Sequence, residues 1–395
     1  MGTASTVIVG SARTPIGRLS GALSSLSAVE LGGLAIAAAL ERAGVPVDQV
    51  DRVVMGHVLQ AGQGQNSARQ AAAKGGVPLD VPAVTVNSVC LSGIHAIHLA
   101  AQMIEAGEAA VVVAGGMESM SQAPYLLPGA RAGFRLGDVT AVDAMIRDGL
   151  WCAFDDVHMG AGTEAYAQAA GISRSRQDAI AAMSHERATI AAKDGRLAEE
   201  IVPVTIRQRR DEIVVDADEG IRADTTADSL ARLRPAFSPD GTITAGNASQ
   251  ISDGAAAVVV MSRAKADELG LAPLAELIGF GLVAGPDPSL LTQPSRAIAR
   301  ALARVGKTVA DVDLFEINEA FAAVAAASMD DLGIGAEVLN VNGGAIALGH
   351  PIGMSGTRLV MTLIEELRRV GGGLGAAALC GGGGQGEAAL VRVGL

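Results

Sequence analysis

The chain has 395 residues, of which 49% are hydrophobic and 18% are charged, and its net charge is −12 at pH 7. This length exceeds one ordinary domain and can bury two sizeable cores, so we expect two or three compact lobes. The acidic balance, with no Lys/Arg cluster interleaved with aromatic residues, excludes an extended nucleic-acid interface.

The first ten residues lack a basic region followed by a long apolar segment, so no secretory signal is expected. The most apolar runs, 109–115 and 254–261, are too short to span a bilayer. Cys90, Cys152 and Cys380 cannot all pair and show no C-x-x-C spacing. We therefore expect a cytoplasmic protein with reduced thiols, no membrane partner and no metal site.

Two distant stretches of the chain follow one plan. In the first half, a predicted helix over 28–42 precedes the sequence Val47-Asp48-Gln49-Val50-Asp51 and an apolar strand over 52–55. In the second half the same order recurs over 294–304, 309–313 and 314–317.

A second pair of segments extends the repeat. A strand over 84–87 leads into Cys90-Leu91-Ser92-Gly93, a helix and a strand over 111–114. Its counterpart comprises 339–342, Ser355-Gly356, a helix with leucines every four residues and a strand over 376–379. Short apolar strands alternating with amphipathic helices predict a duplicated α/β unit with mixed sheets covered by helices on both faces.

Residues 121–251 break this alternation and predict an inserted loop domain. The N-terminal half is then 1–120 plus 252–272, and the C-terminal half is 273–395. Because loops on a packed scaffold are free to vary, binding surfaces tend to lie on them.

Cys90 directly follows an apolar strand and directly precedes a helix. The helix N-terminus and free N–H groups at such a junction favour a thiolate, which is a nucleophile. A small buried core residue is the alternative, and the pattern alone does not separate the two.

His350 lies in Gly349-His350-Pro351-Ile352-Gly353-Met354-Ser355-Gly356, at the place in the second half that corresponds to the Cys90 region. If the halves pack around a pseudo-twofold axis, the two turns meet and form a Cys–His dyad. Without the symmetry argument, a hydrogen-bonded loop histidine is the preferred interpretation.

Two further segments carry candidate residues. Cys380 begins a glycine run through Gly386 between two apolar strands, where exposed N–H groups can bind an oxyanion. Asn318 stands at another strand-to-helix junction, in Glu316-Ile317-Asn318-Glu319-Ala320-Phe321, where the pattern alone favours helix capping.

The segments around Cys90, Asn318, His350 and Cys380, in this order and spacing, resemble the thiolase family over the whole chain. A His-Met-Gly at 158–160 and a Gly-Asn-Ala-Ser at 246–249 are similar to its biosynthetic-type, short-chain members. The resemblance implies a layered α-β-α-β-α core. It also implies that Cys90 is acylated, that His350 activates it, that Cys380 is the second acid/base, and that Asn318 holds a catalytic water. One oxyanion hole would be His350 with this water, and the other the backbone N–H groups of Cys90 and Gly382.

The implied reaction is the reversible condensation of two acetyl-CoA molecules to acetoacetyl-CoA and CoA, with CoA thioesters as substrates and no cofactor. A 3-ketoacyl-CoA thiolase of broader specificity is the alternative. The resemblance further implies a homotetramer, a dimer of dimers, for which residues 117–137 offer contacts.

The inserted segment resembles the CoA-binding loop domain of this family through His158-Met159-Gly160 and Gly246-Asn247-Ala248-Ser249. The positions implied to contact CoA or the acyl group are Leu150, His158, Met159, Arg222, Ser229, Phe237, Ala245, Ser249, Ala320 and Phe321. Three departures from the usual pattern lie beside functional segments and bear on substrate preference: Leu91, Met354 and Gln250-Ile251-Ser252.

Other classes are disfavoured. Residues 381–386 and 279–284 satisfy nicotinamide-binding glycine patterns, but neither precedes the helix that the pyrophosphate requires. A non-catalytic carrier on the same fold is expected to lose Cys or His positions, and none is lost. A decarboxylating ketosynthase typically has a second His where Asn318 stands and lacks Cys380.

Overall fold

The computed structural model describes residues 5–208 and 211–394. Within these residues, the strands of both halves form one ten-stranded mixed sheet in the order β14-β15-β16-β13-β1-β12-β5-β3-β4, with β2 paired to β12. The strands of the N-terminal half are β1 (Thr6–Arg13), β2 (Gly17–Arg18), β3 (Arg52–Gly56), β4 (Ala83–Val86), β5 (Val111–Ser119) and β12 (Ser252–Ser262). Those of the C-terminal half are β13 (Ala275–Ala284), β14 (Leu314–Ile317), β15 (Gly373–Gly381) and β16 (Gln385–Val393).

The strand order is symmetric about its centre. β3 is parallel to β5, which is antiparallel to β12, which is antiparallel to β1. In the other half, β14, β15, β16 and β13 repeat these three relations in the same order. The halves join through a short antiparallel pairing of residues 6–8 of β1 with 275–277 of β13. The duplication predicted from the sequence is therefore confirmed.

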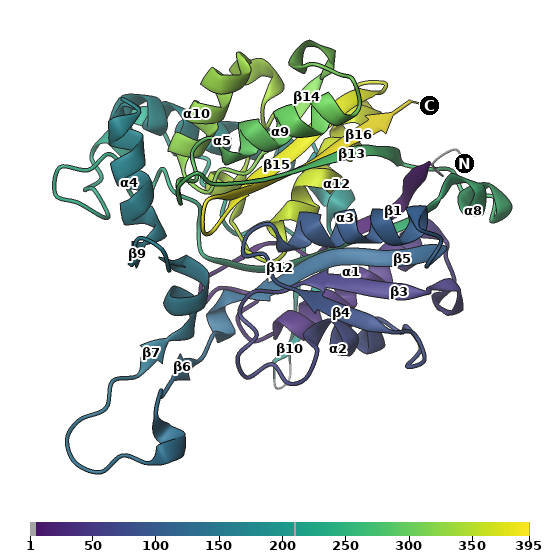
Figure 1. The fold of residues 1–395 in the computed structure, drawn as a ribbon, viewed down its shortest axis with the longest axis horizontal. Helices are drawn as coiled ribbons and strands as arrows, with labels where there is room; N and C mark the ends of the chain where they lie inside the picture. Colours follow the sequence, from purple (N-terminus) through teal and green to yellow (C-terminus); the bar gives the residue numbers. More distant parts are fainter. Residues whose placement is uncertain (1–4, 209–210, 395) are drawn as a thin grey trace.

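Five layers follow from this arrangement (Figure 1). Helices α3 (Ser92–Glu105) and α12 (Ser355–Arg369) lie between the two halves of the sheet and contact each other. The outer face of the N-terminal half is covered by α1 (Ala28–Ala43) and α2 (Ser67–Lys74). The opposite outer layer contains α9 (Gln293–Arg304) and α10 (Ala322–Leu332). The observed layers match the predicted α-β-α-β-α core.

Local sequence explains where these helices begin and end. Ser27 and Glu30 form a capping box at the start of α1, and Gly44 ends that helix with a φ of 66°, which a glycine adopts without steric cost. In α12, Leu359, Leu363 and Leu367 lie on one face and are fully buried, as their spacing predicts.

The segment 121–251 contains more regular structure than its sequence indicates. Its two longer helices are α4 (Met159–Ala169) and α5 (Arg174–Lys193). The shorter elements are β6 (Tyr125–Leu126), β7 (Val142–Asp143), a π-helical turn (Met145–Leu150), β8 (Trp151–Cys152), β9 (Val157–His158), α6 (Arg196–Glu200), β10 (Val204–Gln208), β11 (Asp211–Val215) and α7 (Ala227–Ala231). The remaining α-helices of the described residues are α8 (Arg263–Glu268) and α11 (Ala345–Leu348).

This segment shares the cores of both halves. Ile180 and Ile243 pack in the core of the C-terminal half, whereas Val204 and Ile206 pack in that of the N-terminal half. The connection between β6 and β7 extends away from the body of the molecule (Figure 1). None of the helices in the described ranges is both long and apolar enough to cross a bilayer.

Candidate active site

Cys90 lies in a tight turn between β4 and α3. Val89, the residue before it, has a φ of 52°, which is a strained conformation for a β-branched side chain. The Ser92 hydroxyl secures the turn, because it accepts a hydrogen bond from Ser88 N (2.9 Å) and donates one to Val89 O (2.6 Å). The strain and its local support fix the direction of the Cys90 side chain.

The Cys90 thiol is buried, and the backbone N–H groups of Cys90 and Gly382 point at its sulfur. Burial raises the pKa of Cys90 to about 12; the two N–H groups oppose this increase and Glu118 adds to it. The sequence argument predicted that the helix N-terminus favours a thiolate. That prediction was wrong for the resting site, because desolvation outweighs the N–H groups, so the thiol needs a base to remove its proton.

His350 is a neutral base in this structure. Its Nδ1 lies 2.6 Å from Ser355 Oγ, and this hydroxyl donates to Pro351 O at 2.9 Å. The hydroxyl therefore accepts from Nδ1–H, so Nε2 carries the lone pair that can take a proton. Burial, with a smaller contribution from the Arg358 guanidinium, lowers the pKa of His350 to about 3.

Asn318 follows β14 and does not cap a helix. Phe321 occupies the N-cap of α10, so the capping interpretation of Asn318 was wrong. Its Nδ2 lies 3.4 Å from His350 Nε2. Its Oδ1 is buried and accepts no hydrogen bond from the described residues. A buried amide oxygen of this kind is suited to a small hydrogen-bond donor such as water.

Cys380 is the penultimate residue of β15, and Gly382–Gly384 form the tight connection to β16 that the sequence predicts. Gly383 and Gly384 have φ values of 79° and 68°, and a Cβ on Gly384 would lie 2.1 Å from Asp287 O. Burial and the neighbouring Cys90 raise the pKa of the Cys380 thiol well above its ordinary value. Cys90 thus lies close enough to influence the ionisation of Cys380.

The two halves meet at equivalent glycines. A Cβ on Gly93, near the start of α3, would lie 3.0 Å from Gly353 O, and a Cβ on Gly356, near the start of α12, would lie 2.5 Å from Ile94 N. These contacts bring the Cys90 turn against the loop that carries His350. The meeting of the two turns, inferred from the repeat, is therefore observed.

A pocket of about 490 Å³ adjoins these residues. A backbone hydrogen bond from His350 N to Gln250 O (3.0 Å) joins the pocket wall to the catalytic histidine, and Ala320 of the wall is two residues from Asn318. Eight predicted contact residues line it: Leu150, His158, Arg222, Phe237, Ala245, Ser249, Ala320 and Phe321. The His158 and Phe237 rings stack with centroids 4.9 Å apart, and burial lowers the pKa of His158.

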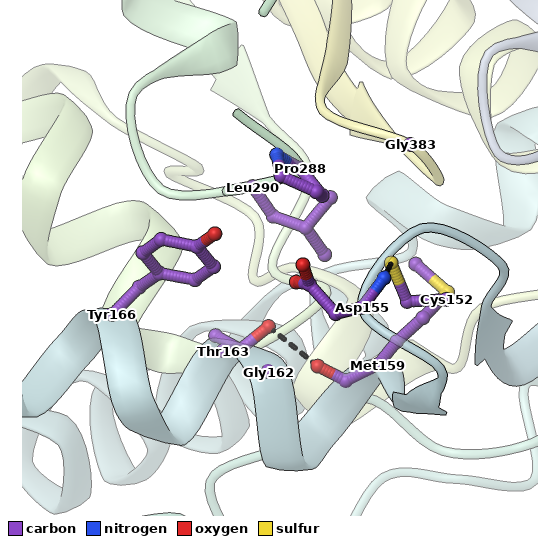
Figure 2. A pocket seen from close by; sticks show the side chains of 9 residues that line it. All are labelled: Cys152, Asp155, Met159, Gly162, Thr163, Tyr166, Pro288, Leu290 and Gly383. Atoms are coloured by element: carbon purple, nitrogen blue, oxygen red, sulfur yellow. Dashed lines mark hydrogen bonds between the residues drawn. The ribbon is translucent and has the colours of Figure 1, made fainter. Parts of the chain in front are cut away.

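Met159 and Ser229 lie elsewhere. Figure 2 shows Met159 beside Cys152 around a second pocket of about 10 Å³, which Gly383 also lines and which has room for a single water. Ser229 is exposed on α7, where its hydroxyl donates to Thr226 O. Contact of these two residues with a ligand stays a prediction.

The chain was compared with known families and structures. The model of the N-terminal thiolase domain matches residues 6–264, and that of the C-terminal thiolase domain matches 271–393. The chain belongs to the thiolase family. A probable acetyl-CoA acetyltransferase of Mycolicibacterium smegmatis is 57% identical over 98% of this chain and 100% of that protein. An acetyl-CoA acetyltransferase of Cupriavidus necator is 53% identical over 98% of each. The crystal structure of the Bacillus anthracis acetyl-CoA acetyltransferase aligns with a TM-score of 0.96 at 42% identity, covering 99% of both chains.

The structure, like the family assignment, argues against nicotinamide binding at the two glycine patterns. Residues 381–386 form the turn between β15 and β16, and residues 279–284 lie inside β13. Neither segment opens a helix, so neither presents a helix N-terminus to a pyrophosphate.

Sequence reasoning assigned no role to two residues that support the site. Ser355 orients His350. The sequence showed this serine five residues after the histidine, in the same glycine-rich motif. Gln250 is one of the departures from the family pattern. Its Nε2 donates to Gly220 O (3.0 Å) and Ile346 O (2.9 Å), which ties the pocket wall to the helical turn before His350. Nothing in the sequence indicated this second role.

The other two departures are buried. Leu91 is fully enclosed, and a Cβ on Gly381 would lie 2.6 Å from its Cγ. Met354 is also fully buried. Both side chains therefore fill the space directly around the two catalytic turns.

Proposed function

We propose that this thiolase is an acetyl-CoA C-acetyltransferase, which converts two acetyl-CoA molecules to acetoacetyl-CoA and CoA, and the reverse. The observation that carries the proposal is the pair of adjacent buried thiols, Cys90 and Cys380, at a site with a neutral histidine. One thiol can hold an acyl group while the other moves a proton. Neither half-reaction needs a cofactor, because the CoA thioesters are themselves the substrates.

In the first half-reaction, His350 Nε2 takes the proton from the Cys90 thiol. The sulfur attacks the thioester carbonyl, and the C–S bond to CoA breaks. His350 returns the proton to the leaving CoA thiolate, so the products are acetyl-Cys90 and CoA. The high pKa of Cys90 makes this base necessary at neutral pH.

In the second half-reaction, His350 takes the proton of the Cys380 thiol, and the Cys380 thiolate acts as a base towards the methyl group of a second acetyl-CoA. The resulting carbanion attacks the acetyl carbon on Cys90, which forms the new C–C bond and breaks the C–S bond to the enzyme. The Cys90 thiolate then takes the proton back from His350, and acetoacetyl-CoA leaves.

Both steps build negative charge on a thioester oxygen. The Cys90 and Gly382 N–H groups converge on one point and form one oxyanion hole. The other uses His350 and a water held by Asn318, and the buried Oδ1 without a protein donor supports this assignment.

The large pocket is the proposed binding site for the pantetheine and acyl parts of the substrate. Its mostly apolar wall includes Leu150, Phe237 and Phe321, and Arg18 and Arg222 supply cations for the phosphates of CoA. The ten predicted contact residues remain assignments to be tested by ligand binding.

Covalent labelling tests the nucleophile. Wild-type protein incubated with radiolabelled acetyl-CoA should retain one acetyl group per chain, and Cys90→Ala should retain none. Cys152→Ala is the matched control, since Cys152 is also a buried free cysteine, and it should label normally. Unchanged labelling of Cys90→Ala would overturn the assignment.

The substrate preference separates this proposal from a broad 3-ketoacyl-CoA thiolase. His158-Met159-Gly160 resembles short-chain members, and the fully buried Met354 restricts the space beside His350. Each methylene left out of an apolar pocket loses ~0.8 kcal/mol of burial. Acetoacetyl-CoA should therefore be cleaved with a much higher kcat/KM than a 3-ketoacyl-CoA of eight or more carbons, and equal values would favour the broad enzyme.

The proposal extends to assembly and location. The protein acts as a homotetramer, a dimer of dimers, supported by the projecting β6–β7 connection with exposed Leu127, Phe134 and Leu136. Met117 and Met120, from the predicted contact segment, are buried in the protein's own core and are not part of this surface. The reaction takes place in the cytoplasm, where the three free cysteines stay reduced.

A further inference from the structure

Outside the catalytic centre, two histidines and a glutamate converge between α3 and β16. His95 and His98 are three residues apart on α3 and so lie on one face of that helix. Glu387 comes from β16, almost three hundred residues away. Its Oε1 lies 2.7 Å from His98 Nδ1, and its Oε2 lies 3.1 Å from His95 Nδ1.

The carboxylate is the buried centre of this cluster. The Glu387 side chain is fully enclosed, whereas His95 retains 24% exposure and His98 retains 11%. The two imidazole nitrogens hold this carboxylate from one face of α3, so a buried acidic group faces two nitrogen ligands.

We propose that His95, His98 and Glu387 bind a divalent transition-metal ion, with Zn²⁺ as the favoured species. One ligand atom from each residue lies within 4.8 Å of the others, and this is the one such group of three that the described residues contain. Two imidazole nitrogens and one carboxylate are a common donor set for zinc. The inference is independent of the proposed reaction, because neither histidine nor Glu387 has a role in it.

The spacing suits zinc after a small adjustment. Zinc–ligand bonds of about 2.0–2.1 Å in a tetrahedron place neighbouring ligand atoms roughly 3.3 Å apart. Glu387 Oε1 lies 2.7 Å from His98 Nδ1 and 3.2 Å from His95 Nδ1, which are hydrogen-bonding distances, so these contacts open by up to a few tenths of an ångström when the ion replaces the Nδ1 protons.

The surroundings already orient His98 as a ligand. Its ring stacks on Phe280, with centroids 4.3 Å apart and planes 7° from parallel. Its Nε2 lies 3.2 Å from the Gln102 side-chain amide. When the metal takes Nδ1, the proton resides on Nε2, and the amide turns to present its oxygen as the acceptor. This outer hydrogen bond is typical of metal-binding histidines.

The partial exposure of His95 leaves a path from solvent for the ion and for a water as fourth ligand. The ion would connect α3, which begins next to Cys90, to β16, whose Glu387 pairs in register with Leu379. Because the unfolded chain cannot assemble these ligands, binding should stabilise the folded protein. No sequence pattern indicated this site, because Glu387 lies almost three hundred residues from the two histidines in the chain.

Cobalt substitution and zinc titration test the proposal on the purified full-length protein after treatment with a chelator. Co²⁺ should bind with one equivalent per chain and produce visible d–d bands without thiolate charge-transfer absorption, because the ligands are nitrogen and oxygen. Zn²⁺ should displace it and raise the melting temperature. Absence of stoichiometric binding, or a thiolate spectrum, would overturn the proposal.

His95→Gln and Glu387→Gln identify the ligands. Each should weaken Co²⁺ and Zn²⁺ binding by at least about tenfold and abolish the thermal shift. His95 is half-buried on a helix surface, so His95→Gln is expected to fold. It therefore tests the metal site even if Glu387→Gln does not fold. Cys90→Ser is the matched control, since it removes an active-site thiol that also attracts zinc, and it should leave the Co²⁺ spectrum unchanged. Retained affinity in His95→Gln, or loss of the spectrum in Cys90→Ser, would reject the site.

Discussion

The chemistry of individual residues in this thiolase is set by burial. Cys90, His350 and Cys380 are all enclosed, and desolvation is the largest cause of each pKa shift. Burial keeps the thiols protonated and the imidazole neutral, so the resting site carries no charge on these three groups. Charge appears only when substrate arrives and a proton moves between them.

Replacing Cys380 by serine should separate the two half-reactions. A hydroxyl is a far weaker base than a thiolate, yet Cys380→Ser leaves Cys90, His350 and the Gly382 turn in place. The variant should still form acetyl-enzyme, seen by intact-protein mass spectrometry, while condensation falls by ~10²–10⁴-fold, measured as acetoacetyl-CoA formed. His350→Ala should impair both steps.

One outcome would contradict the separate roles assigned to Cys90 and Cys380. If Cys380→Ser does not acylate detectably, but condenses at the wild-type rate relative to whatever acylation remains, Cys380 serves the first half-reaction instead.

The low pKa of His350 also predicts how stability depends on pH. The unfolded histidine titrates near 6.5 and the folded one near 3, so between these values the unfolded chain binds the extra proton. The contribution of His350 to stability is complete above pH 6.5 and is lost progressively as pH falls towards 3, by up to about 1.4 kcal/mol per pH unit.

Denaturant unfolding at pH 7.5 and pH 5 measures this effect. His350→Gln removes the titrating group, so its unfolding free energy should fall less than that of the wild type over this interval. Identical pH slopes for the two proteins would contradict the assignment of a buried neutral His350.

At the scale of elements, α4 shapes the substrate pocket through a glycine. A Cβ on Gly160 would lie 2.1 Å from the Phe237 ring, which stacks on His158 and contacts Phe321 edge-on. Gly160 therefore lets the helix approach the aromatic group that lines the pocket. This explains in physical terms why a glycine follows His158-Met159.

Gly160→Ala should displace the Phe237 ring and weaken binding of acetyl-CoA. We expect KM to increase by about tenfold, which corresponds to ~1.4 kcal/mol, with a smaller change in kcat. Gly162→Ala is the control on the same helix, because its Cβ would meet nothing closer than 3.6 Å. Steady-state kinetics should show a near-normal KM for the control. Equal effects of both variants on KM would contradict the proposed role of Gly160.

At the scale of the whole molecule, the exposed apolar side chains on the projecting β6–β7 connection form the surface proposed to pack in the tetramer. Leu136 is fully exposed, and Phe134 is 49% exposed. Burying a leucine contributes about 1.5–3 kcal/mol, which is large for one contact in an interface.

Leu136→Asp should therefore shift the protein from tetramer to smaller assemblies in mass photometry. Val370→Asp is the matched control, since Val370 is 57% exposed at the end of α12, away from this connection. A tetramer that persists in Leu136→Asp at nanomolar concentration, or a wild-type protein that is monomeric, would reject the proposed interface.

Much of the architecture was predictable because periodicity and repetition are local properties. The predicted helix over 28–42 and strand over 314–317 correspond to α1 and β14, and the repeated order implied that the Cys90 and His350 turns meet. Family motifs then supplied candidate roles for Cys90, His350, Cys380 and Asn318. The inserted segment was less predictable, because the buried faces of helices such as α5 are set by contacts with α10 and α11 of the C-terminal half rather than by their own pattern.

Sequence alone therefore determined the elements of the two halves, the duplication, the family and the identities of the candidate catalytic residues, all of which depend on order along the chain. Only the tertiary structure decided the protonation of the two thiols and His350, because desolvation depends on what surrounds a group in space. It likewise decided the contact of Asn318 with His350, the support from Gln250 and the convergence of His95 and His98 on Glu387, since each joins residues whose separation in sequence carries no signal of their proximity.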